Sequence, residues 1–183
     1  MSGKYAIQIK SEYKPDAVQK GVYLVLLNAN LVPPHIGMLI DGSYHSLTIK
    51  GQEVAIKGSV LVKNISLRKI PTVFIKIKKH PVFSNHYLSD TFIEQVKLFD
   101  KVNDDTNTCL SPIRLFFEEF YAIPKERIKL VFDLLTSLKE NDFIETTFGT
   151  NLGELKEHIF YLQSYSETDL KMQIAKELQR AKP

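Results

Sequence analysis

Residues 36–49 of the chain read Ile36-Gly-Met-Leu-Ile-Asp-Gly-Ser-Tyr-His-Ser-Leu-Thr-Ile49, two largely apolar segments on either side of an Asp-Gly pair. Asp-Gly favours a two-residue turn in which both residues adopt positive φ, and such a turn connects antiparallel strands. The pattern therefore predicts a β-hairpin with its turn at Asp41-Gly42.

Further strand signals surround this hairpin in the first half of the chain. The unbroken apolar run Val22–Leu27 is typical of a strand buried on both faces. Gly58 is expected to form a bend or bulge between two short strands. The predicted strands, besides the hairpin, are Tyr5–Lys10, Val22–Leu27, Val54–Ile56, Ser59–Val62 and Thr72–Ile77.

The second half of the chain has apolar residues at helical spacing. A turn is expected over residues 103–108, where Asn, Asp and Thr predominate. Pro124 is expected in the first turn of a helix, where proline is tolerated. The predicted helices cover residues 90–102, 109–121, 124–140, 151–164 and 168–181.

Strands followed by helices favour an α+β fold, with an antiparallel β-sheet of about five to six strands packed against helices. The chain has 183 residues, a length that suits one domain over 1–183.

Composition and motifs exclude several classes of function. The net charge of +3 is too small and too evenly spread to predict nucleic-acid binding. No glycine-rich phosphate loop and no ligand spacing of a known zinc site occurs, so neither a cofactor nor a metal is predicted. The longest apolar run is too short for a transmembrane segment. The absence of a signal peptide and the single cysteine favour a cytoplasmic location.

Cys109, His35 and His45 are the residues that could carry chemistry. If Thr108 caps the following helix, Cys109 lies in its first turn, where free N–H groups stabilise a thiolate and an oxyanion. If Ser111-Pro112 begins the helix instead, Cys109 lies in the preceding turn. A nearby imidazole would complete a thiol–histidine pair. The alternative is a cysteine that serves only as a small buried apolar residue.

The segment Pro34-His35-Ile-Gly-Met-Leu-Ile-Asp41-Gly42-Ser-Tyr-His45 resembles the histidine hairpin of the permuted papain-like cysteine hydrolases. That group includes NlpC-type peptidases and the lecithin–retinol acyltransferase family. Asn107-Thr108-Cys109-Leu-Ser-Pro-Ile-Arg-Leu-Phe-Phe117 is similar to the start of their cysteine helix. The resemblance covers residues 20–121, the expected papain-like core, and leaves residues 122–183 as a C-terminal helical extension.

The resemblance implies that Cys109 is the nucleophile, that His35 is the general base and then the acid, and that His45 orients His35. It also implies that the Cys109 thiol and the His35 ring lie within hydrogen-bond reach. The family places its second histidine two residues further along, so Thr48 is an alternative orienting residue. The implied substrate is an amide or ester: a small peptide, an isopeptide, a peptidoglycan fragment or an acyl lipid.

Two other functions are compatible with the same sequence. The helices after Pro124 could make the chain a non-enzymatic interaction module. The basic segment Lys76-Ile-Lys78-Lys79 could bind a phosphate or a lipid headgroup, although alternating lysines at the end of a strand often form a solvated face.

Overall fold

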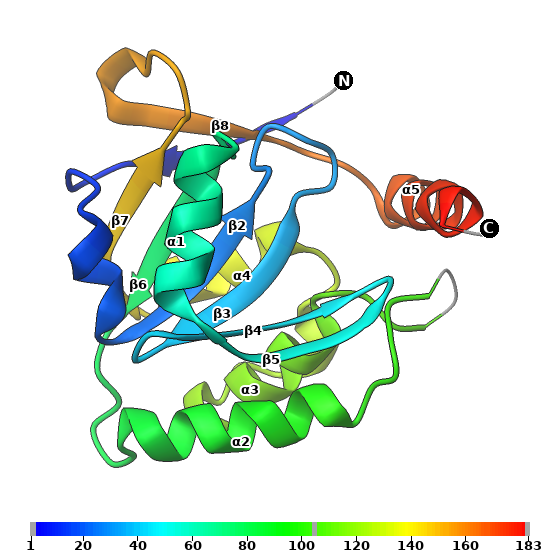
Figure 1. Ribbon diagram of the computed structural model, residues 1–183, viewed down its shortest axis with the longest axis horizontal. Coiled ribbons are helices and arrows are strands. Elements are labelled where there is room, and N and C mark those ends of the chain that lie inside the picture. Colours follow the sequence, from blue (N-terminus) through cyan, green and yellow to red (C-terminus); the bar gives the residue numbers. More distant parts are fainter. Residues whose placement is uncertain (1–2, 104–105, 182–183) are drawn as a thin grey trace.

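The computed structural model describes residues 3–103 and 106–181. Its described part contains a six-stranded antiparallel sheet of order β5-β4-β3-β2-β6-β7 and a separate two-stranded sheet of β1 and β8 (Figure 1). The predicted α+β class is therefore confirmed. The strands are β1 (Lys4–Gln8), β2 (Val22–Leu27), β3 (His35–Ile40), β4 (Ser43–Thr48), β5 (Gly51–Lys57), β6 (Thr72–Ile77), β7 (Ile144–Thr150) and β8 (Ile159–Gln163).

The predicted hairpin is formed by β3 and β4. Asp41 and Gly42 connect the strands with φ values of 44° and 74°, as a two-residue turn of this kind requires. The Asp41 carboxylate also accepts a hydrogen bond of 2.7 Å from the Gly21 N–H. This bond ties the turn to the start of β2, the neighbouring strand.

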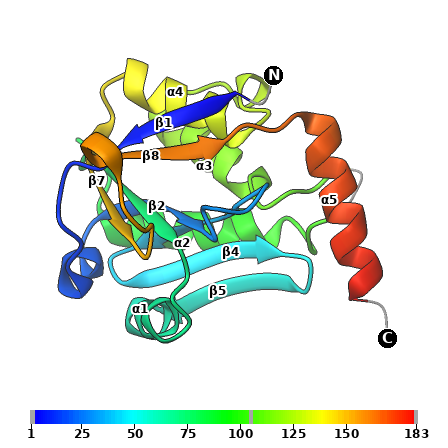
Figure 2. The same ribbon diagram turned by 90° about the horizontal axis from the view of Figure 1, so that it is seen from above.

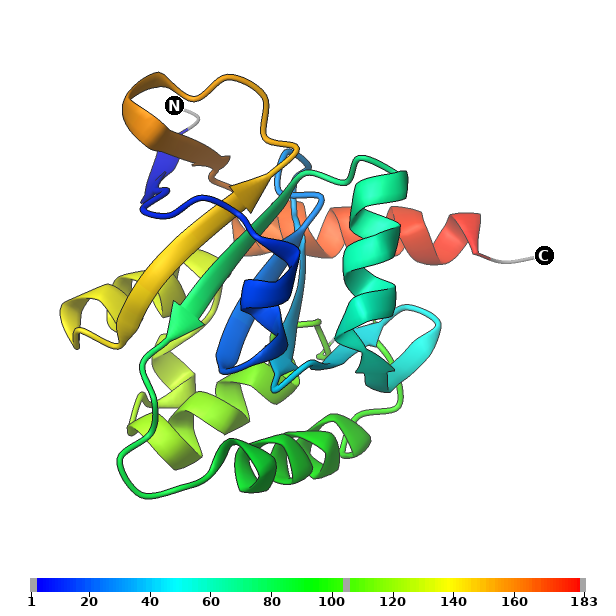
Figure 3. The same ribbon diagram turned by 60° about the vertical axis from the view of Figure 1, so that its left-hand side comes forward.

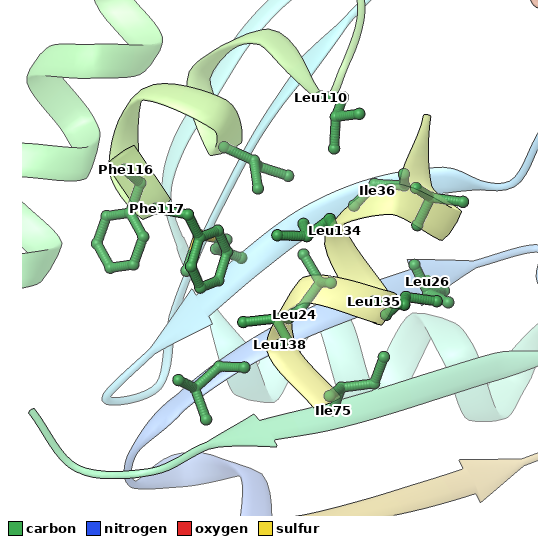
Figure 4. Close-up of a cluster of buried hydrophobic side chains, with 14 of the residues drawn as sticks. Leu24, Leu26, Ile36, Ile75, Leu110, Phe116, Phe117, Leu134, Leu135 and Leu138 are labelled. Carbon is green, nitrogen blue, oxygen red and sulfur yellow. The ribbon is translucent and has the colours of Figure 1, made fainter. Parts of the chain in front are cut away.

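Helices cover both faces of the main sheet, and β2 is buried between them (Figure 3). On one face, α2, α3 and α4 form the larger core, in which leucines of α4 point toward β2, β3 and β6 (Figure 4). On the other face, α1 and the short η1 pack against a smaller cluster. The helices are η1 (Pro15–Gln19), α1 (Gly58–Leu67), α2 (Asn85–Lys97), α3 (Ser111–Tyr121), η2 (Lys125–Arg127), α4 (Val131–Glu140), η3 (Lys156–His158) and α5 (Glu167–Arg180).

Three predicted elements have different boundaries or a different type. The strand expected at Ser59–Val62 is the start of α1, because Leu61, Val62 and Ile65 lie on one helical face against the sheet. The helix expected over 124–140 is split into η2 and α4. The helix expected over 90–102 begins earlier, at Asn85, where the Ser84 hydroxyl caps it by accepting a hydrogen bond from the Tyr87 N–H.

The segment predicted as a helical extension, residues 122–183, is only partly helical over its described part, residues 122–181. The helix predicted over 151–164 is wrong, because this region contains η3 and β8, which pairs with β1 from the other end of the chain. The strand β7 was not predicted and extends the main sheet by pairing with β6. The predicted last helix is confirmed as α5. None of the described helices is both long and apolar enough to cross a lipid bilayer.

Candidate functional site

A groove of about 480 Å³ lies at the end of the main sheet where β3 begins and β4 ends. Its lining includes His35, Thr48, Glu53 and Cys109. Leu170 and Ile174 of α5 close one side, and Figure 2 shows this helix across the end of β4. Most of the remaining lining side chains are apolar, namely Leu27, Leu31, Val32, Pro33, Pro34, Ile49 and Val102.

Cys109 lies in the turn immediately before α3. Of the two predicted helix starts, the later one is correct, because α3 begins at Ser111 and has Pro112 in its first turn. The Ser111 hydroxyl accepts a hydrogen bond of 2.9 Å from the Thr108 N–H, and the Thr108 hydroxyl accepts one of 3.2 Å from the Leu110 N–H. The predicted turn over 103–108 is present around this point, although residues 104 and 105 lie outside the described residues.

Cys109 lines the groove and is partly exposed as a residue, but its thiol group is buried. Burial of the thiol raises its pKa, and the backbone N–H groups of Ile36, Cys109 and Leu110 oppose this effect in part. The net pKa is raised, so the resting side chain is a thiol rather than a thiolate at neutral pH. The same three N–H groups can stabilise negative charge that develops near the sulfur.

His35 is the first residue of β3 and pairs with Leu27 of β2. Its Nε2 is buried and has no hydrogen-bond partner in the described part of the chain. Burial lowers the pKa of His35, and the negative charge of Glu53 raises it by a smaller amount. The imidazole is consequently neutral at neutral pH and able to accept a proton.

His35 and Cys109 line the same groove, but the predicted hydrogen bond between them is absent from the described residues. The two side chains approach from different sides of the sheet. His35 lies on the face of Leu27, under α1, and Cys109 packs beside Leu47 on the other face. Both can line one groove because the β3–β4 pairing stops at Gly37, so the start of β3 and the end of β4 are not paired with each other.

The structure contradicts the orienting role predicted for His45. This side chain is fully buried on the opposite face of the sheet from His35, paired with Met38 and packed against Phe92 of α2. Its Nδ1 accepts a hydrogen bond of 2.9 Å from the Ala55 N–H, and its Nε2 lies 3.2 Å from the Ser89 Oγ. Both ring nitrogens are therefore occupied away from His35.

The length of the hairpin turn explains the error. With a two-residue turn, paired residues such as Met38 and His45 are separated by an odd number of positions. A residue of β3 and a residue of β4 that are an even number of positions apart therefore face opposite sides of the sheet. His35 and His45 are such a pair.

Thr48, the alternative orienting residue, lies on the face of His35 and lines the groove. Its hydroxyl donates a hydrogen bond to the Gly51 carbonyl at 3.0 Å and accepts one from the Lys50 N–H at 3.1 Å. These bonds stabilise the turn between β4 and β5. Among the hydrogen bonds of the described residues, none joins Thr48 to His35.

Glu53 of β5 is the site residue that the sequence analysis missed. Its carboxylate accepts a hydrogen bond of 2.8 Å from the Ser46 hydroxyl and raises the pKa of His35. A bulge shifts the β4–β5 register between Tyr44 and Ser46, and Ala55 has a φ of 54° there. Because the position of Glu53 depends on this bulge, no local motif indicates it.

The basic segment forms ion pairs on the side of the sheet where β7 lies. Lys76 Nζ is 2.7 Å from the Glu145 carboxylate, and Lys78 Nζ is 2.6 Å from that of Asp142. Most of its positive charge is therefore already paired. Among the described residues, no group of three or more His, Cys, Asp or Glu side chains is arranged to hold a metal ion.

No model of a protein family matches the chain, and neither a curated protein nor a solved structure is significantly similar to it.

Proposed function

We propose that the chain is a cysteine-dependent hydrolase or acyltransferase of the permuted papain-like type, with Cys109 as nucleophile and His35 as base and acid. One observation carries the proposal. A single groove is lined by a partly exposed cysteine whose thiol lies near three backbone N–H groups, and by a histidine whose buried Nε2 has no partner in the described part of the chain. The unpartnered nitrogen is costly for folding alone, and a role in proton transfer accounts for it.

The neutral state of both groups indicates general-base catalysis rather than a resting thiolate–imidazolium pair. When a substrate carbonyl enters the groove, the Cys109 Sγ forms a bond to the carbonyl carbon while its proton passes to the His35 imidazole. This transfer requires the His35 ring to turn from the α1 face of the sheet toward the sulfur when substrate is bound, since hydrogen bonds at catalytic sites often form fully only in the substrate complex. The N–H groups of Ile36, Cys109 and Leu110 stabilise the charge on the carbonyl oxygen.

Collapse of this intermediate breaks the carbon–nitrogen or carbon–oxygen bond of the substrate. The proton on His35 passes to the leaving amine or alcohol, and an acyl group remains on Cys109. Water, or a second acceptor in an acyltransferase, then loses a proton to His35 and attacks the thioester. The carbon–sulfur bond breaks, the acyl product leaves, and the proton on His35 returns to the sulfur of Cys109. Glu53, rather than His45, is the residue that stabilises the positive charge of His35 during these steps.

The lining of the groove limits the substrate. Its walls are mainly apolar, its charged lining residues are the carboxylates of Glu53 and Glu177, and no Lys or Arg occurs among its described lining residues. A peptide, isopeptide or acyl amide with a neutral or positively charged group next to an apolar one suits this lining better than an anionic substrate.

Covalent capture of an acyl group tests the proposal. The protein is mixed with a p-nitrophenyl ester of a short apolar acyl group, and the acyl adduct is measured by intact mass. We expect one adduct on Cys109, none in Cys109→Ala, and capture at pH 7 slowed by about 100-fold or more in His35→Ala. His158→Ala, an exposed histidine, is the matched control and should react like the parent. Capture that does not depend on His35 would refute the proposal.

A further inference from the structure

A second cavity, of about 270 Å³, lies between the two sheets and shares no lining residue with the Cys109 groove. Ile7 of β1, Ile75 of β6, Leu135 of α4 and Ile144 of β7 supply apolar walls. Figure 2 shows the β1–β8 pair lying beside α4 and β7, where this cavity forms. Its volume is close to the lower end of the range for small-molecule sites, so it suits one narrow ligand.

Positive charge gathers at the edge of this cavity. Lys10 and Lys139 line it, and Lys78 forms an ion pair with Asp142, the one carboxylate among the described lining residues. Lys10 and Lys139 have no ion-pair partner in the described part of the chain. The positive charge of the lysines at this edge therefore exceeds the negative charge of the Asp142 carboxylate.

Backbone contacts hold these charged residues in place. The Lys10 N–H donates to the Thr147 carbonyl at 3.1 Å, which fixes the end of β1 on β7. Asp142 lies two residues after the end of α4, and its N–H donates to the carbonyl of Lys139 at 3.1 Å. The segment after β1 and the end of α4, which are far apart in the sequence, are thus both fixed at one end of the apolar cavity.

From this arrangement we propose that the cavity binds a single-chain carboxylic acid of medium length. Its alkyl chain lies between Ile7, Ile75 and Ile144, and its carboxylate lies at Lys10 and Lys139. Apolar walls provide the affinity for the chain, and the excess of lysine selects an anionic over a cationic head group. This site is independent of the Cys109 chemistry.

Titration with sodium decanoate, below its micelle concentration, tests the site. We expect saturable binding by calorimetry, with amide NMR shifts confined to β1, β6, β7, β8 and the end of α4. Lys10→Gln and Lys139→Gln should each weaken binding by about two- to fivefold, the range for exposed ion pairs. Lys63→Gln, on the exposed side of α1, is the matched control and should bind like the parent. Cys109→Ala should also bind normally.

Decyltrimethylammonium has the same chain length and the opposite charge, and we expect it to bind at least about tenfold more weakly. Ile144→Trp, which fills the cavity, should abolish decanoate binding in a protein that still melts cooperatively. The proposal is overturned if decanoate does not saturate, if its NMR shifts lie around Cys109, or if the cationic analogue binds equally well.

Discussion

Protonation of His45 should destabilise the fold, and the cause is visible in its hydrogen bonds. The Nδ1 accepts from the Ala55 N–H, so the neutral ring carries its proton on Nε2, which donates to the Ser89 Oγ. A second proton would place an N–H on Nδ1 directly against the N–H of Ala55. Burial, only partly opposed by the charge of Asp90, lowers the pKa of His45 from 6.5 to about 4.

The sign and size of the effect follow from this pKa. Between pH 6.5 and 4 the unfolded chain binds a proton at His45 and the folded chain does not, so stability is complete above pH 6.5 and is lost as the pH falls. From pH 8 to pH 5 the loss amounts to about 2 kcal/mol in the free energy of unfolding.

Urea denaturation of the parent and of His45→Gln at pH 8 and pH 5 measures this loss. The variant lacks the titrating ring, so its stability should fall by about 2 kcal/mol less than that of the parent over this range. His158→Gln, which replaces an exposed histidine far from α2, should follow the parent. Equal losses in the parent and in His45→Gln would show that His45 titrates normally and that the account of its hydrogen bonds is wrong.

Two further substitutions test the surroundings of the groove. Glu53→Gln should lower the rate of acyl capture roughly tenfold at pH 7, because the imidazolium of His35 loses its stabilising charge. The control Glu177→Gln, on α5, should change this rate little. Equal effects of the two substitutions on the rate would show that Glu53 has no part in the mechanism. Gly37→Ala should lower the free energy of unfolding by about 1–3 kcal/mol, because its Cβ would overlap the ring of Tyr44. An unchanged melting temperature in Gly37→Ala would contradict this packing.

The sequence predicts elements whose signals are local. Asp41-Gly42 between apolar segments is sufficient for the β3–β4 hairpin, and the continuous run of β2 is sufficient for a buried central strand. The strand β8 was mistaken for a helix because its partner is β1, near the other end of the chain. Pairing over such a distance leaves no local pattern. The start of α1 was mistaken for a strand because Val60 and Val62 are β-branched, and packing against the sheet outweighs that preference.

The candidate site was predictable in part for a similar reason. Cys109 and His35 follow from the chemistry of their side chains and from a motif, and the structure places both at one groove. The side of the sheet on which His45 lies depends on the number of residues in the turn. The position of Glu53 depends on a bulge in the neighbouring strand. The first property follows from the two-residue turn predicted at Asp41-Gly42, whereas no local signal in the sequence indicates the second.

The pH dependence of acyl capture tests most directly whether Cys109 and His35 act as one unit. With a neutral thiol and a neutral imidazole, the capture rate of the parent should rise as His35 loses its proton, at an apparent pKa below 6.5, and stay level from pH 7 to 8. In His35→Ala the rate should keep rising above pH 9, because only the thiolate of Cys109, whose pKa is raised, can react. The same profile in both proteins would contradict the proposed active site.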